Sequence, residues 1–462
     1  MPRRFAVLCA CWLSAFAPLT FSQDVDAELP LSDDEMQVLV ADLMAEVVSL
    51  RGRVVELEGR LQDGDAVGAA LERLAKREST GAPAHGMNVY YKQGLRFEAA
   101  DGSFKSKLGG RVHWDVTTGS ADSDLEDSLG DIEDGSEIRR ARLAYSGSIY
   151  DQFEFKTQYD FAGGDADFKD VYMRFKQVPV LQNVTVGQFK EPMGLDEMTS
   201  SNVQPFVESN LAVALVPARS VGIGVSGKTD DKNLGWAAGW FKDDDGFGES
   251  EGGDGDSAVT ARVFGTPIYE DEGRRVLHLG VSGSRRSPSD DMVRYSARPE
   301  AHQVQKFVDT GDFESDEVNL FGIELAGIEG PFHYQFEYTR AENDTPDGDA
   351  DFSGNSIQIG YFLTGEHRGY NHGSGSFGRV AVIDPALTAE PGWGPGAWEL
   401  ALRKSHLDLD DGPIAGGTLD DWTLGLNWYL DPLTRVMLDY IRADLEGEGD
   451  ADLAVLRVQR EF

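Results

Sequence analysis

Residues 107–116 read KLGGRVHWDV, and this stretch decides the fold. Apolar residues or glycine occupy every second position, from Leu108 to Val116, and polar residues or glycine occupy the positions between them. A period of two residues is that of a β-strand with one apolar face and one polar face. The stretch is therefore predicted to form an amphipathic strand.

The same alternation recurs to the end of the chain. Sixteen such segments lie near 104–117, 136–149, 152–161, 167–177, 183–190, 219–229, 233–242, 257–265, 275–285, 317–327, 331–341, 353–364, 396–406, 418–429, 433–442 and 452–462. An even number of alternating strands of roughly ten residues is typical of a transmembrane β-barrel. The predicted fold is all-β, a sixteen-stranded antiparallel transmembrane barrel over residues 94–462.

The connections between these strands alternate in length. Short turns such as Tyr150-Asp151 and Asp431-Pro432 alternate with long loops rich in Gly and Asp at 118–135, 243–256, 286–316 and 341–352. Short periplasmic turns and long extracellular loops are the rule in outer-membrane barrels. A soluble β-sandwich would show the same strand alternation, but it does not require this loop pattern. Aromatic residues near strand ends, such as Trp114 and Trp428, also favour a membrane barrel.

The N-terminus is predicted to be a secretory signal peptide over residues 1–22. Arg3 and Arg4 precede an apolar run from Phe5 to Phe21, and Ser22 is a small residue at the cleavage position. Both cysteines of the chain, Cys9 and Cys11, lie inside this segment. The mature protein is therefore predicted to use neither disulfides nor thiolate metal sites.

Residues 31–78 are predicted to form a short α-helical coiled coil in the periplasm, followed by a linker at 79–93. Apolar residues alternate steps of three and four, which is the a/d seam of a heptad repeat: Val40, Leu43, Val47, Leu50, Val54, Leu57 and Leu61. The flanking pair Glu46 and Arg51 has the opposite charges expected between partner helices. Val at a and Leu at d favour a coiled coil of two helices, and a single amphipathic helix is the alternative.

The composition excludes a nucleic-acid partner. The chain of 462 residues has 80 Asp and Glu against 42 Lys and Arg, a formal charge of −38, whereas nucleic-acid binding needs clustered basic residues. Many acids lie in two predicted loops, at 122–137 and 243–256. These loops are expected to keep the outer surface solvated, with divalent cations and lipopolysaccharide as the other possible partners.

Six motifs, in this order along the chain, resemble the phosphate-selective porin O and P family. They are FKSKLGGR at 104–111, IRRARL at 138–143, VGQFKEP at 186–192 with Thr199-Ser200-Ser201, YFLTGE at 361–366, GAWEL at 396–400 and GLNWY at 425–429. The resemblance covers residues from about 90 to 462. It implies a sixteen-stranded trimeric outer-membrane porin whose basic lumen attracts anions, with residues 191–218 folded into the lumen as a constriction loop.

Basic residues on the polar faces of the first strands are candidates for an anion path. Placing the apolar faces outward predicts that Lys107, Arg111, Arg140, Arg142, Lys156 and Arg174 face the lumen, with Asp170 among the opposing acids. The resemblance adds Arg139, Lys190 and Asn202 to these pore and anion-binding residues. Arg suits phosphate oxygens because its planar guanidinium donates two hydrogen bonds at once.

Three positions depart from the pattern of the family. Glu197, Asn202 and Ser209 stand where the resemblance implies two lysines and an arginine. A constriction loop that lacks these three cations should bind phosphate less tightly. Small anions, with phosphate or polyphosphate among them, are therefore the predicted solutes, and they are expected to cross the outer membrane by passive diffusion.

Other motifs give no support to an enzyme or a cofactor. Residues 222–229 read GIGVSGKT, a match to the phosphate-binding G-x-x-x-x-G-K-[ST] loop, but the strand continues through the motif and no helix follows it. The eight His residues never form H-E-x-x-H, so no metal site is predicted. The alternatives left open are a tether between outer membrane and cell wall through the coiled coil, and a nucleotide-binding protein that uses 222–229.

Overall fold

The computed structural model describes residues 86–242, 257–389 and 392–462. The predicted signal peptide, the coiled coil, the first part of the linker and the loop at 243–256 lie outside the described residues. In the described part of the chain, no helix is long and apolar enough to cross a membrane.

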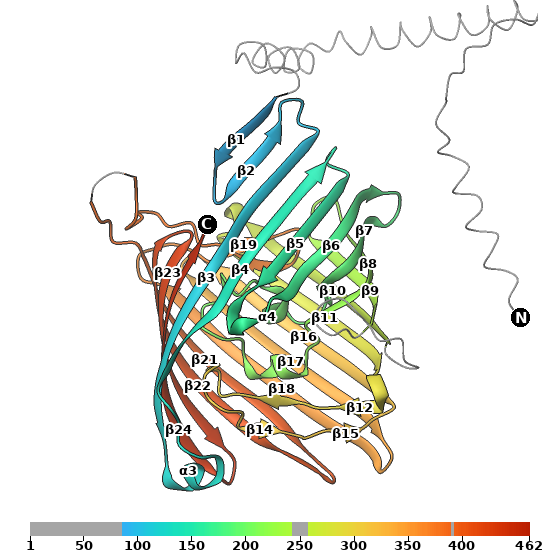
Figure 1. Ribbon diagram of the computed structural model, residues 1–462, viewed down its shortest axis with the longest axis vertical. Helices are drawn as coiled ribbons and strands as arrows, with labels where there is room; N and C mark the ends of the chain where they lie inside the picture. The colour runs from blue at the N-terminus through green and yellow to red at the C-terminus, as the bar shows by residue number, and fades with distance from the viewer. Residues whose placement is uncertain (1–85, 243–256, 390–391) are drawn as a thin grey trace, which may run out of the picture. The chain divides into compact units, whose positions relative to one another are not determined.

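Sixteen antiparallel strands of the described residues close into a barrel (Figure 1), as the alternation predicts. They are β3 (Phe104–Ala121), β4 (Gly135–Ile149), β5 (Phe153–Asp160), β6 (Asp167–Val178), β7 (Gln182–Lys190), β8 (Arg219–Lys228), β9 (Leu234–Lys242), β10 (Ser257–Glu270), β11 (Arg275–Ser287), β16 (Glu317–Glu329), β17 (Phe332–Thr345), β18 (Gly348–Phe362), β21 (Ala397–Asp411), β22 (Ile414–Asp431), β23 (Thr434–Leu445) and β24 (Gly449–Glu461). The predicted sixteen-stranded barrel is confirmed.

The last strand closes the barrel against the first. β24 pairs with β3 from Glu461 opposite Arg111 to Ala451 opposite Ala121. Beyond the end of β24, Phe462 and Gly110 exchange two backbone hydrogen bonds, of 2.9 and 3.1 Å. We call the end of the barrel that holds the C-terminus the Phe462 end, and the opposite end, which carries the short helix α3 (Ser123–Leu129), the α3 end.

The two faces of the barrel follow the sequence pattern. On β3, Val112 and Trp114 point outward and are 40% and 42% exposed, whereas His113 and Asp115 point inward and are almost completely buried. Burial of polar residues is possible here because the interior is filled by hydrogen-bonding chain segments. The barrel therefore has an apolar outer face and a polar interior, as expected of a membrane barrel.

A hairpin of β1 (Met87–Tyr91) and β2 (Leu95–Ala99) extends the sheet at the Phe462 end. β2 pairs with residues 105–108 of β3, on the edge that β24 leaves free. The sequence predicts a linker over 79–93, and β1 lies within that range. Val89, Tyr90 and Tyr91 favour a strand, but a run of five residues is too short to show the alternation clearly.

Parts of three connections lie inside the barrel (Figure 1). Residues 191–218 carry α4 (Leu195–Met198) and η2 (Leu211–Leu215), and residues 288–316 carry η4 (Ser289–Asp291), β12 (Met292–Val293), β13 (Ser296–Ala297), β14 (Val308–Asp309) and β15 (Phe313–Glu314). Residues 363–396 carry β19 (Gly369–Asn371) and β20 (Ser376–Gly378). The remaining short elements are η1 (Ala162–Gly164) and η3 (Asp271–Gly273).

The connection 363–396 differs from the predicted alternation of loop lengths. It joins β18 to β21 at the Phe462 end, where the alternation of loop lengths predicts only short turns. Its hairpin is held against the opposite wall, because the Gly375 carbonyl accepts a hydrogen bond of 2.8 Å from Arg262 and the Tyr370 hydroxyl lies 2.7 Å from Nδ1 of His278. These contacts hold the β19–β20 hairpin of this connection inside the barrel.

Candidate functional site

Residues 191–218, which we call the inner loop, are held to one side of the barrel by carboxylates. Glu337 on β17 accepts hydrogen bonds from the backbone amides of Leu195 and Asp196, the second at 3.1 Å. Asp439 on β23 accepts from the amide of Val207 at 2.8 Å. Both carboxylates are almost completely buried. The acids on this arc therefore bind the inner loop and do not face an open path.

An arginine cluster also holds the inner loop, at Glu208. Oε1 of Glu208 lies 2.9 Å from Nε of Arg139 and 2.7 Å from Nη2 of Arg457, and Oε2 lies 3.5 Å from Nη2 of Arg140. Burial raises the pKa of the Glu208 carboxyl, but the charges of Arg140, Arg139 and Arg457 outweigh this effect and hold the pKa well below its usual range. Glu208 is therefore ionised at neutral pH.

A β-bulge explains how two successive arginines reach the interior. His113 pairs with Arg140, but the next residue of β3, Trp114, pairs with Ile138, so Arg139 has no partner on β3. An unpaired extra residue interrupts the alternation of faces. Arg139 and Arg140 both contact Glu208 for this reason. Strict alternation alone would place Arg139 on the outer face.

A cavity of about 360 Å³ lies between the inner loop and strands β3 to β8, and we call it the central cavity. The charged residues that line it are Arg111, Arg140, Arg142, Lys156, Arg174, Lys190, Arg219, Asp170 and Glu197. Seven basic side chains against two carboxylates give this lining a net charge of +5. The cavity is therefore strongly basic inside a protein whose overall charge is −38.

Several of these cations are paired. Nε of Arg142 lies 2.6 Å from Asp160, Nε of Arg219 lies 2.7 Å from Asp170, and Nζ of Lys190 lies 3.0 Å from Glu197. Lys156 also contacts Asp170, and Arg174 lies 3.8 Å from Glu154. These pairs fix the directions of the basic side chains and reduce the charge that each presents.

Two cations of the cavities, Arg111 and Lys107, have no carboxylate partner in the described part of the chain, and Arg140 has donors that its partner Glu208 does not reach. Nη1 of Arg111 donates to the Ser201 hydroxyl at 3.1 Å and makes no ion pair there. Lys107 has neither an ion pair nor a side-chain hydrogen bond among the described residues. In Arg140, Nε and Nη1 are buried without a hydrogen-bond partner. An anion in the cavities can bind Arg111 and Lys107, because their charges are not neutralised by a carboxylate of the described residues.

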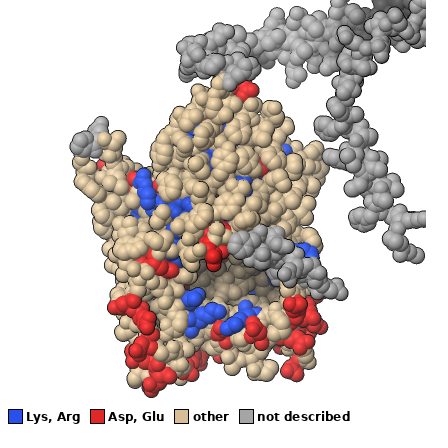
Figure 2. Space-filling view, in the orientation of Figure 1, with Lys and Arg blue, Asp and Glu red and all other residues tan. Residues whose placement is uncertain are grey.

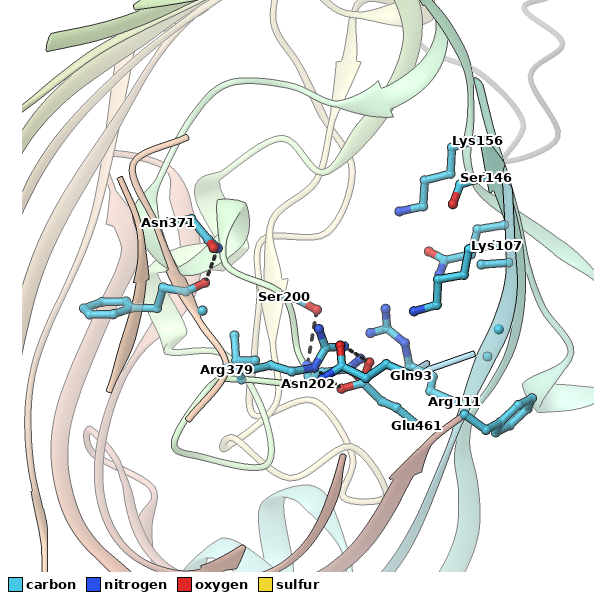
Figure 3. A pocket seen from close by; sticks show the side chains of 18 residues that line it. Gln93, Lys107, Arg111, Ser146, Lys156, Ser200, Asn202, Asn371, Arg379 and Glu461 are labelled. Carbon is cyan, nitrogen blue, oxygen red and sulfur yellow. Dashed lines mark hydrogen bonds and ion pairs between the residues drawn. The ribbon is translucent and has the colours of Figure 1, made fainter. Parts of the chain in front are cut away.

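A second cavity, of about 490 Å³, continues from the central cavity toward the Phe462 end, and we call it the terminal cavity (Figure 3). Both cavities are lined by Arg111, Lys156, Gln158 and Ser200. In Figure 3, Lys107, Lys156 and Arg111 project into the terminal cavity from one wall, and Arg379 extends toward them from the other side. The two cavities therefore adjoin, and basic residues line both of them. We call the two cavities together the path.

The structure brings together most of the predicted pore residues. Lys107, Arg111, Arg140, Arg142, Lys156, Asp170, Arg174 and Lys190 line one or both cavities. Asn202 lines the terminal cavity, with its Oδ1 3.1 Å from Nε2 of His113. Arg139 lies outside both linings and holds Glu208 of the inner loop.

Two basic residues of the path were not predicted. Arg219 is the first residue after the inner loop, and its position before the apolar Val221 was a signal that could have placed it. Arg379 belongs to the connection 363–396 and forms a salt bridge with Glu461. No periodicity marks Arg379, because its direction depends on tertiary contacts alone.

The surface of the α3 end has the opposite charge. Figure 2 shows Asp and Glu gathered at the rim of this end and Lys and Arg inside the hollow. The N-cap of α3 belongs to this rim, with Asp122 accepting from the Leu125 amide at 3.0 Å. The separation of acidic rim and basic interior means that the net charge of the chain does not describe the path.

The sequence GIGVSGKT does not form a phosphate-binding loop. Residues up to Lys228 belong to strand β8, and Thr229 begins a turn into β9. No helix follows the motif, so the amides of a helix N-terminus that would hold phosphates are not present there. Among the described residues, no group of three or more His, Cys, Asp and Glu could hold a metal ion.

Residues 107–462 match the family model described as "Phosphate-selective porin O and P". The chain belongs to this porin family. A protein of Caulobacter vibrioides, named only as uncharacterized, is 30% identical over 466 residues, which cover 93% of this chain and 90% of that protein. The family and the barrel indicate an outer-membrane channel rather than an enzyme.

Solved structures of outer-membrane proteins share the fold of this porin. A loop-deletion mutant of OmpT from Vibrio cholerae is 12% identical with a TM-score of 0.50, and the match covers 78% of this chain and 100% of that one. An anion-selective porin from Comamonas acidovorans is 11% identical with a TM-score of 0.48, with the same coverage. At these identities the likeness to the Vibrio protein supports the barrel fold alone.

Proposed function

We propose that this porin passes small anions across the outer membrane by passive diffusion through the central and terminal cavities. The observation that carries the proposal is the net charge of +5 on the residues that line the central cavity. Rings of Arg and Lys are the usual basis of anion selectivity in pores. An anion that loses part of its hydration shell is stabilised there, whereas a cation is repelled.

The arrangement of acids supports this proposal. Glu324, Glu337, Glu399 and Asp439 are at most 5% exposed. Glu337 and Asp439 bind the inner loop, whereas Glu324 pairs with Arg262 and Glu399 contacts His333, both on the barrel wall. Their negative charge is therefore kept from the path by these partners. The remaining wall, β3 to β8, supplies the charge that a solute meets.

The pairing of the cations suits conduction rather than tight binding. Conduction requires sites that an ion can both enter and leave, and several weak sites in series satisfy this need. Arg142, Arg219 and Lys190 each share their charge with a carboxylate, so none of them offers an anion a full unit of charge. Passage through such a row is expected to be fast.

Selectivity for phosphate is not part of the proposal. Glu197 neutralises Lys190 at 3.0 Å, Asn202 is bonded to His113, and the hydroxyl of Ser209 accepts from Gln204 at 3.0 Å. The three positions that depart from the family pattern thus add no cation to the path. We expect phosphate to pass with no preference over other small anions.

Single-channel recording tests the proposal. The purified full-length porin in a planar bilayer, under a KCl gradient, is expected to show a reversal potential that corresponds to chloride selectivity. Phosphate added at millimolar concentration is expected to leave most of the chloride current. Cation selectivity, or no conductance, would refute the proposal.

The export and assembly of the chain belong to the same proposal. We propose that residues 1–22 direct export, that residues 31–78 form a periplasmic coiled coil, and that the Phe462 end faces the periplasm. The porin is expected to be a homotrimer in the outer membrane, surrounded by lipid and lipopolysaccharide. The heptads alone favour a coiled coil of two helices, which would give a dimer. Light scattering on the detergent-extracted protein distinguishes the dimer from the trimer.

A further inference from the structure

An aromatic surface lies inside the barrel, beside the basic residues. The rings of Tyr172 and Phe189 have centroids 6.4 Å apart, and those of Phe189 and Phe241 are 5.3 Å apart, both in edge-to-face contact. These residues come from β6, β7 and β9. The interior of a water-filled barrel is usually polar, so a continuous aromatic surface there calls for a function.

Glycines in the wall make room for these rings. A Cβ atom at Gly222 would lie 2.7 Å from a ring atom of Phe241, and one at Gly239 would lie 2.6 Å from the same ring. A Cβ at Gly224 would lie 3.0 Å from the ring of Phe189. Two of these glycines belong to the sequence GIGVSGKT. Their role in the structure is to let aromatic rings lie against the interior wall.

Part of this aromatic surface is open to the path. Tyr172, Phe189 and Met198 are partly exposed and line the central cavity, whereas Phe241 is completely buried behind Phe189. Phe189 and Met198 also line an adjoining cavity of about 330 Å³. We call the two rings of Tyr172 and Phe189, together with the apolar side chain of Met198, the aromatic patch. Phe241 packs against the ring of Phe189 and holds that ring in place.

The aromatic patch shares the central cavity with the cations. The guanidinium of Arg174 lies over the ring of Tyr172, 5.0 Å from its centroid. Arg111 and Arg140, which have donors free of carboxylates, line the same cavity. One cavity of about 360 Å³ therefore offers both an apolar surface and unpaired N–H donors.

We propose that the central cavity selects organic anions that carry an apolar ring, with an aromatic carboxylate as the chemical class. The carboxylate would bind Arg111, and the ring would lie on the aromatic patch. A small inorganic anion uses only the cations, so it gains nothing from the apolar surface. This inference rests on the proposed anion path and specifies its substrate class.

Competition with chloride tests the substrate class in the unaltered protein. Benzoate and acetate have the same carboxylate, and only benzoate has a ring. Single-channel chloride current is measured while either anion is added. Benzoate is expected to halve the current at a concentration about tenfold lower than acetate, because partial burial of one ring yields a difference of that order. Phosphate is expected to resemble acetate.

Two matched variants locate the effect. Phe189→Ala removes a ring from the patch, and Phe175→Ala removes one from the outer face of the neighbouring strand, where Phe175 is 48% exposed. Phe189→Ala is expected to reduce the preference for benzoate to less than threefold, and Phe175→Ala to leave it unchanged. Chloride conductance of each variant shows that its barrel has folded.

The outcomes separate this inference from the proposed function. Equal block by benzoate and acetate in a chloride-selective channel would overturn the aromatic substrate class and leave the anion path intact. Equal losses of preference in the two variants would overturn the assignment to the aromatic patch. A cation-selective channel would refute the anion path itself and, with it, the substrate class.

Discussion

Arg111 is the residue whose charge the anion path should depend on most. It lines both cavities, and its only side-chain hydrogen bond among the described residues is to Ser201. Arg111→Gln keeps a donor for Ser201 and removes one positive charge. The net charge of the central lining then falls from +5 to +4. The charge that is not paired with a carboxylate falls by a larger fraction, because Arg111 is one of the few cations there without an ion pair among the described residues.

The electrostatic effect of this change can be worked out from Coulomb's law. A unit charge 4 Å from an anion contributes about 1 kcal/mol in bulk water and about 4 kcal/mol at an effective dielectric constant of 20. The wet central cavity lies between these limits. Because about 1.4 kcal/mol corresponds to a factor of ten, the ratio of chloride to potassium permeability is expected to fall about tenfold.

The assay is the reversal potential in a KCl gradient, measured for Arg111→Gln and two controls. Arg111→Lys keeps the charge and is expected to keep the selectivity. Lys105→Gln removes a charge from the same face of β3, but Lys105 is bound to Asp151 at 3.2 Å and lines neither cavity, so it should have little effect. An unchanged permeability ratio in a conducting Arg111→Gln channel would refute the reasoning.

Three further predictions concern the segments that shape the path. Because the pKa of Glu208 is depressed in the folded protein, its contribution to stability is fully present above the unfolded pKa of about 4.3 and is lost only as the pH falls through the lower folded value. Glu208→Gln should therefore lower the thermal unfolding temperature equally at pH 7 and pH 5, and a difference confined to pH 7 would contradict this sign. Arg262→Met leaves Glu324 buried without its bidentate partner. The barrel should therefore lose about 3–5 kcal/mol of unfolding free energy in denaturant titrations, and current noise should rise because the hairpin at Gly375 loses its contact with Arg262. Unchanged stability would show that the Arg262–Glu324 pair is unimportant. Gly222→Ala places a Cβ 2.3 Å from the Trp240 carbonyl oxygen, whereas Gly265→Ala places one 3.5 Å from its nearest neighbour. In denaturant titrations only Gly222→Ala should therefore lower the unfolding free energy, by about 1–3 kcal/mol.

The sequence predicted the wall of the barrel well, because the position of each wall residue follows from a local pattern. Alternation alone separates outward Trp114 from inward Asp115, and it fails at bulges such as the one at Arg139. The β1–β2 hairpin was missed because strands of five residues give too few alternations to recognise. A strand that short is stabilised mainly by its neighbour β3.

The interior of the barrel was harder to predict. The cations on β3 to β6 could be placed from their strands, but the partners of the inner loop could not, since Glu337 and Asp439 lie more than 100 residues along the chain from the loop residues that they bind. The bulge at Arg139 also breaks the rule that places its neighbours. Long-range contacts of this kind leave no periodic signal in a single sequence.

The seam between β3 and β24 has a consequence for how the protein forms. It joins residues that are more than 300 positions apart, and contacts of such large sequence separation are costly to close and slow to form. The inner loop depends on Asp439 and Arg457, which belong to the last two strands. A nascent or partly assembled chain thus has no defined lumen, and the ability to distinguish one ion from another is acquired only when synthesis is complete and the two ends of the chain have met.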